Sequence, residues 1–101
     1  MKRYQESLIH ALRDPEEAAA YLNAALEDGR GEMFLVALRN VAEANGGMSA
    51  VSQKSKLNRA NLYKIFSKNG NPEINSLSQI LRLFGLRLAV ASRKNESKKA
   101  A

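Results

Sequence analysis

Residues 49–68 read SAVSQKSKLNRANLYKIFSK. Their apolar spacing predicts two short helices, 49–55 and 59–68, joined by a tight connection. We expect Ser49 and Asn58 to cap these helices, because a side-chain oxygen at that position accepts an N–H group that the first helical turn leaves free. Two short helices held between longer ones predict a helix-turn-helix unit.

The second of these helices has an apolar and a polar face. Leu62, Ile65 and Phe66 are expected to point inward, as is Val51 of the first helix. In a helix-turn-helix the second helix enters the major groove of DNA, and the first crosses the backbone. The side chains expected to face outward from the second helix are Arg59, Ala60, Asn61, Tyr63, Lys64 and Ser67.

Residue chemistry assigns roles to this outward face. Arginine pairs with guanine and asparagine with adenine, so Arg59 and Asn61 are candidate base readers. Ala60 is small enough to allow close approach or to contact a thymine methyl group. Tyr63 and Ser67 can bond phosphates. Further phosphate contacts are expected from the preceding helix and turn, at Gln53, Lys54 and Lys56.

Several of these residues also have a purely structural interpretation. Arg59, Lys64 and Lys68 can be ordinary solvated charges of a surface helix, although Lys68 is included in the predicted DNA-binding set. Tyr63 can pack its ring on a neighbour. Asn58 is better explained as a cap than as a base reader.

The charge of the chain is unevenly distributed. The 101 residues carry a net charge of +6, but residues 1–30 hold four basic and six acidic residues. Residues 31–101 hold twelve basic and four acidic residues, and none of the acidic ones stands between Glu43 and Glu73. A positive field without carboxylates attracts phosphate, although a solvated basic face is the alternative. The charge therefore indicates a polyanionic partner without identifying it.

The remaining sequence predicts an all-α fold with one extended segment. Further helices are expected from Asp14-Pro15 to Gly29, at 32–44 and at 76–84, with a short helix or an ordered arm at 4–13. Apolar residues alternate over 86–91, which is typical of a strand that pairs with its copy or with another protein, or of an extended tail. We expect an N-terminal extension (1–30) packed on the main domain, a helix-turn-helix domain (31–92) and a disordered basic tail (93–101).

The composition excludes several classes of function. The chain has no cysteine and a single histidine, His10, so neither thiol chemistry nor a metal cluster is expected. Neither a nucleophile–base pair nor a phosphate-binding glycine loop is evident, so we expect neither an enzyme nor a cofactor. No apolar run approaches the ~18 residues of a membrane span, and no signal peptide is evident, so the expected location is the cytoplasm.

Several motifs, in a fixed order, carry a family resemblance over residues 21–90. They are YLNAALEDG at 21–29, ALRNVAEA at 37–44, LNRANLYK at 57–64, GNP at 70–72 and LFGLRL at 83–88. The combination resembles the addiction-module antidote proteins, HigA-like antitoxins with a Cro/C1-type (XRE-type) helix-turn-helix. The resemblance implies a five-helix domain similar to that of lambda repressor.

The resemblance also implies two activities. One is binding of a homodimer to double-stranded operator DNA in the promoter of its own gene pair. The other is tight binding of a small toxin of the RelE/ParE superfamily, which blocks the toxin. The residues that match the recognition-helix surface are Arg59, Asn61, Tyr63 and Lys64. Residues 1–30 match the N-terminal extension of the family, and this acidic segment would suit a basic toxin.

The sequence departs from the family pattern at Lys56, where glycine is usual between the two short helices. Lys56 must adopt a glycine-like backbone conformation at some cost, or the turn differs. Two other functions stay open. One is a stand-alone XRE-type repressor without a toxin, and the other is a protein-binding inhibitor whose helix-turn-helix no longer binds DNA.

Overall fold

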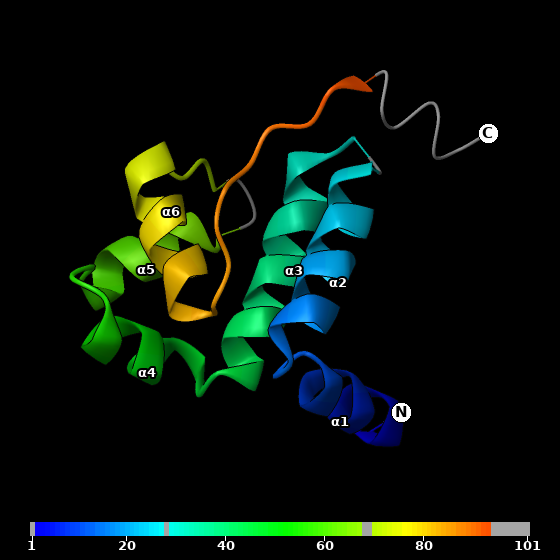
Figure 1. The fold of residues 1–101 in the computed structure, drawn as a ribbon. Coiled ribbons are helices and arrows are strands. Elements are labelled where there is room, and N and C mark those ends of the chain that lie inside the picture. Colours follow the sequence, from blue (N-terminus) through cyan, green and yellow to red (C-terminus); the bar gives the residue numbers. More distant parts are fainter. Residues whose placement is uncertain (1, 28, 68–69, 94–101) are drawn as a thin grey trace.

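The computed structural model describes residues 2–27, 29–67 and 70–93, and over these it is all-helical, as predicted. The helices are α1 (Lys2–Ala11), α2 (Pro15–Glu27), α3 (Gly31–Ala44), α4 (Gly47–Lys54), α5 (Arg59–Ile65) and α6 (Ile74–Leu83) (Figure 1). The segment 4–13, for which the sequence predicts a short helix or an ordered arm, lies mostly in a helix, α1. None of the described helices is long and apolar enough to cross a membrane.

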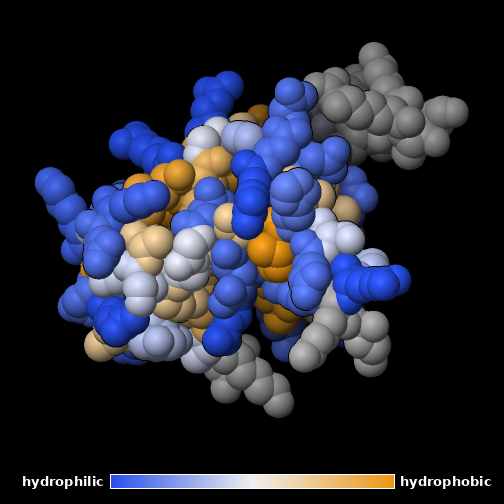
Figure 2. Space-filling view, turned by 90° about the horizontal axis from the view of Figure 1, so that it is seen from below, coloured by the Kyte–Doolittle hydropathy of each residue, from blue (hydrophilic) through white to orange (hydrophobic). Residues whose placement is uncertain are grey.

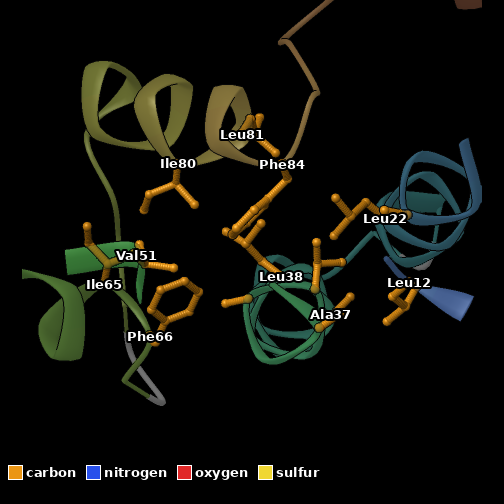
Figure 3. Packing of buried hydrophobic residues seen from close by; sticks show 14 of the residues in the cluster. Leu12, Leu22, Ala37, Leu38, Val51, Ile65, Phe66, Ile80, Leu81 and Phe84 are labelled. Atoms are coloured by element: carbon orange, nitrogen blue, oxygen red, sulfur yellow. The ribbon is translucent and has the colours of Figure 1, made fainter. Parts of the chain in front are cut away.

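Helix α3 is the central helix of the fold. It packs on α1, α2 and α4, and α4 in turn packs on α5 and α6. Leu38 and Val41 of α3 have no exposed surface. Figure 3 shows Phe84 reaching from the end of α6 toward Leu38, while Ala37 lies on the side of α3 that faces Leu22. One helix therefore joins the α1–α2 part of the fold to the α4–α6 part.

The predicted start of α2 and the predicted end of α6 are confirmed. A carboxylate oxygen of Asp14 accepts the N–H of Glu16 at 3.2 Å, so Asp14 caps the start of α2. Helix α6 ends before Gly85, whose φ of +77° is the left-handed conformation that glycine adopts without strain. The N–H of Leu86 then donates to the carbonyl oxygen of Leu81 at 2.9 Å, which closes the last turn of the helix.

Two predicted helix starts are wrong. Helix α4 begins at Gly47 rather than Ser49, because Gly46 turns the chain with a left-handed φ of +104° directly after α3. A Cβ at Gly46 would lie 2.7 Å from the Cβ of Ala50, so only glycine fits there. Helix α6 begins at Ile74 rather than Ser76. Ile74 is 71% exposed, so it does not contribute to the apolar pattern that located this helix.

Helix α5 ends earlier than predicted, at Ile65 instead of residue 68. The hydroxyl of Ser67 donates to the carbonyl oxygen of Lys64 at 2.8 Å. The backbone N–H of Ser67 points to the same oxygen, at 3.3 Å, which is the spacing of a turn rather than of a continuing α-helix. The last outward position of the predicted helix, Ser67, therefore lies just beyond α5.

The segment after α6 forms no strand among the described residues of the single chain, so its pairing with a copy or with another protein stays a prediction. Residues 86–92 belong to no helix or strand within the described part of the chain. In Figure 1 this segment (orange) runs from the end of α6 toward the end of the molecule where α2 and α3 meet. Of the predicted tail 93–101, only Arg93 lies within the described residues, and it is exposed.

Truncation of Leu38 to alanine tests the central position of α3. Leu38→Ala removes buried methyl groups between two parts of the fold and should lower the free energy of unfolding by about 2–5 kcal/mol. Val36→Ala is the matched control, because Val36 lies on the same helix but is 55% exposed, and it should change stability by less than about 0.5 kcal/mol. Urea unfolding followed by circular dichroism measures both, and equal losses would contradict the central role of Leu38.

Candidate nucleic-acid interface

The two short helices α4 and α5 contact each other across a turn formed by residues 55–58. The Ser55 hydroxyl oxygen accepts the N–H of Leu57 at 3.2 Å. The side-chain oxygen of Asn58 accepts the N–H of Asn61 at 2.7 Å, which confirms Asn58 as the N-cap of α5. Two side chains thus hold the turn and fix where α5 begins.

The backbone at Lys56 shows how the chain accommodates a lysine where the family usually has glycine. Among the described residues only glycines have a positive φ, so Lys56 does not occupy a glycine-like conformation. The turn therefore differs from one that requires glycine, and the hydrogen bond from Leu57 to Ser55 is part of what closes it. Lys56 is exposed and can point its ammonium group to a ligand without backbone strain.

The apolar faces of both helices are buried as predicted. Val51 of α4 is 2% exposed, and Leu62 of α5 is completely buried. Ile65 and Phe66 complete the apolar face and belong to the same core cluster as Leu38. Because these side chains fix one face of the pair against the core, the opposite face is left for solvent or a ligand.

The outward face carries the residues that the sequence singled out. Exposed are Gln53, Lys54, Lys56, Arg59, Ala60, Tyr63, Lys64 and Ser67, whereas Asn61 is half-buried. Lys68 lies outside the described residues. The surface seen from below, the side on which α4 lies in Figure 1, is mainly hydrophilic with scattered hydrophobic side chains (Figure 2).

Arg59 links the two helices. Its Nη2 donates a hydrogen bond to the hydroxyl oxygen of Ser49, so the first residue of α5 is tied to α4. The sequence assigned Ser49 to a cap and gave no signal for this contact between residues ten positions apart. Because a hydroxyl is neutral, Arg59 is oriented but keeps its full charge for an anion or a base.

The basic residues of this face are not neutralised by neighbouring acids. Within the described residues, Lys54, Lys56, Arg59 and Lys64 form no ion pair. The sequence contributes to this, because residues 44–72 contain no acidic residue. The four exposed cations therefore give this face a positive potential in which several charges add.

A groove of about 310 Å³ borders the pair beyond α5. Asn61, Lys64 and Ser67 line one wall, and Glu73 lies in the segment that forms the other. The close approach of this segment needs Gly70, because a Cβ there would lie 2.0 Å from the carbonyl oxygen of Ile65. Glu73 marks the edge of the positive surface, since its carboxylate would repel phosphate.

Ser67 has a more limited role than the sequence suggested, whereas Tyr63 remains open to a ligand. Ser67 already donates its single hydroxyl proton to the carbonyl oxygen of Lys64, so it must break that bond to donate to a phosphate. Tyr63 is 54% exposed, so its ring is only partly packed and the remainder is open to solvent. Tyr63 can therefore contact a ligand.

These features define an all-helical protein with a basic, two-helix surface mounted on a buried core. A protein-family model described as "Probable addiction module antidote protein" matches residues 3–92. The chain is also 32% identical, over 79 residues, to an uncharacterized protein of Haemophilus influenzae, covering 78% of this chain and 80% of the relative. No solved structure matches. The chain belongs to the family of probable addiction module antidote proteins.

Removal of the Asn58 side-chain oxygen tests the cap. Asn58→Ala should lower the free energy of unfolding by about 1 kcal/mol, because the N–H of Asn61 loses its acceptor. Asn58→Ser keeps an acceptor at this position and should retain most of the stability. Thermal unfolding of the two variants measures the difference. Equal stability of the alanine and serine variants would show that this hydrogen bond does not hold the start of α5.

Proposed function

We propose that the protein is the antitoxin of a type II toxin–antitoxin module. It binds and neutralises a toxin of the RelE/ParE superfamily, and as a homodimer it represses its own operon by binding operator DNA. Membership of the antidote family supports the antitoxin role. The exposed, acid-free surface of α4 and α5 supports the DNA-binding role.

The observation that carries the DNA-binding proposal is the arrangement of the Asn58-capped helix α5. Its buried Leu62 fixes the helix orientation, and Arg59, Ala60, Tyr63 and Lys64 lie on the exposed side. This is the arrangement expected of a Cro/C1-type recognition helix that enters the major groove. Lys54 and Lys56, at the end of α4 and in the turn, are then positioned for the phosphates that flank the groove.

Within this surface, Arg59 is the strongest candidate for contact with a base. The hydrogen bond to Ser49 holds its side chain and reduces the rotamer entropy that binding would otherwise cost. A bidentate contact of an arginine with guanine contributes about 1–3 kcal/mol of discrimination. Asn61 is half-buried and lies in the groove beside α5, so its amide can reach only a base that approaches this edge.

Substitution of Arg59 tests whether it contacts a base or a phosphate. Arg59→Ala should reduce discrimination between operator variants by about 1–3 kcal/mol at the position that Arg59 recognises. Mobility-shift titrations of the full chain on its upstream DNA and on single-base variants measure this. Arg82→Ala is the matched control, since Arg82 is an exposed cation at the end of α6, outside the pair.

A uniform loss of affinity across all operator variants would instead identify Arg59 as a phosphate contact. No salt-sensitive binding of the wild-type chain to its upstream DNA would refute the repressor role and leave a purely protein-binding inhibitor. Specific operator binding without any affinity for a neighbouring small protein would favour a stand-alone repressor.

The exposed carboxylates of α2 are the proposed toxin contact. Glu16, Glu17 and Glu27 are exposed, and residues 1–30 are net acidic. An acidic surface attracts a basic partner and accelerates its association. Deletion of residues 1–30 is not a clean test, because Leu12 and Leu22 belong to the core.

Charge reversal on the surface is the cleaner test of the toxin contact. The double variant Glu17→Lys/Glu27→Lys should weaken binding to the toxin at least tenfold and leave operator binding intact. Isothermal titration with the basic toxin encoded beside the gene, and rescue of growth in cells that express it, measure the effect. Glu43→Lys is the control, because Glu43 is an exposed acid on α3, outside residues 1–30. Unchanged toxin affinity of the double variant would contradict this assignment.

A further inference from the structure

An exposed extended segment, residues 87–91, makes no backbone hydrogen bond with any described residue. It follows Leu86, whose N–H is bonded to Leu81 at the end of α6. All five residues are exposed, and none has a backbone hydrogen bond within residues 2–27, 29–67 and 70–93. A row of free N–H and C=O groups in extended backbone is the edge to which another strand adds.

The side chains of this segment continue into an apolar surface. Leu88 is 40% exposed and Val90 is fully exposed. Leu88 also lines a cavity of about 200 Å³ whose opposite wall is α2, with Leu22 and the 55% exposed Leu26. Alternation places Leu88 and Val90 on the same face of the segment. Backbone groups without a partner among the described residues therefore occur together with exposed apolar side chains, as expected of a strand that lacks its neighbour.

We propose that this segment pairs antiparallel with the same segment of a second copy. The two-fold axis between the strands passes midway between Ala89 and the partner's Ala89. The inference rests on the homodimer of the proposed function and assigns its surface. A two-fold axis that relates antiparallel strands passes midway between one residue and its own copy, so only a few registers are possible. In the register centred on Ala89, Leu88 lies opposite the partner's Val90, and Arg87 lies opposite the partner's Ala91.

The neighbouring registers are less favourable. Centring on Val90 would place Arg87 opposite the partner's Arg93, and like charges directly opposite each other are destabilising. Centring on Leu88 would bring Ala91 opposite the partner's Gly85, whose φ of +77° does not fit a strand. The register on Ala89 pairs all five free residues, matches apolar with apolar side chains and keeps the arginines apart.

The same pairing explains why the partner is a copy of this chain. The segment is self-complementary, because Leu88 and Val90 form the same contact twice about the axis. The cavity beside Leu88 lies next to the position of the partner's Val90 in this register. The partner's isopropyl group can then cover apolar surface of Leu88 and Leu26 that is exposed in the single chain.

Single cysteines test the register directly, because the chain has no cysteine of its own. Ala89→Cys places the thiol opposite its own copy, and mild oxidation of the full chain should link most of it as a covalent dimer. Ala91→Cys is the matched control. Its two copies would be offset by four residues, or about 13 Å along the strands, and should not link. A mixture of Arg87→Cys and Ala91→Cys chains should link to each other.

The mass of the unmodified chain tests the dimer without DNA or toxin. Light scattering should give twice the 11.1 kDa of the chain. Val90→Lys should raise the dissociation constant of the dimer at least tenfold without loss of helix content, because Val90 makes no core contact. Ile74→Lys, at an exposed position of α6, should leave the dimer intact.

Three results would overturn the proposal, and none depends on operator or toxin binding. One is a monomeric wild-type chain, including one whose segment 87–91 becomes protected only when a toxin is added. Another is linkage of Ala91→Cys as readily as Ala89→Cys. The third is a Val90→Lys dimer of unchanged affinity. A dimer that passes these tests but fails to bind upstream DNA would refute the operator role alone.

Discussion

The burial of α3 on both sides is the constraint on which the rest of the structure depends. Leu38 and Val41 are completely inaccessible to solvent, and α3 contacts α1, α2 and α4. A small domain buries a limited share of its surface, so one helix that serves two packing interfaces is an economical core. Helix α3 contacts both the acidic helix α2 and helix α4 of the basic pair, so two surfaces of opposite charge share one core.

The basic pair is positioned by one local cap and by contacts with other elements. Val51 and Leu62 anchor one face in the core, and the Asn58 cap sets the start of α5. The hydrogen bond from Arg59 to Ser49 adds a link between the helices. The helices and the Arg59 side chain are thus held before binding, which lowers the conformational entropy lost at these groups when a rigid partner binds.

Local chemistry explains what could be predicted from the sequence. The Asp14 and Asn58 caps, the turn at Gly85 and the buried faces of α4 and α5 each depend on residues within about one helical turn of each other. The starts of α4 and α6 were predicted wrongly because residues near them have a character that their place in the fold does not follow. Ser49 resembles a cap but accepts a hydrogen bond from a distant arginine, and Ile74 is an apolar residue that the fold leaves exposed.

In the candidate site, too, the sequence could predict some features and not others. The sequence could identify the outward residues of α5, because burial of Leu62 and Ile65 determines which positions remain exposed. It could not place Ser49 beside Arg59, or Glu73 across the groove from Lys64, since these residues are brought together only by packing of separate elements. The alternation over 86–91 predicted an extended segment, but only the structure shows that its backbone groups lack partners within the described residues.

The central claim is that the cations of α4, α5 and the turn between them bind the phosphates of duplex DNA. The dependence of operator affinity on salt concentration tests this most directly, because each phosphate contact releases counterions. If the claim is correct, the logarithm of the affinity falls linearly with the logarithm of salt concentration, and Lys54→Gln reduces the slope by about one. A flat dependence for the wild-type chain, or a slope that Lys54→Gln leaves unchanged, would contradict it.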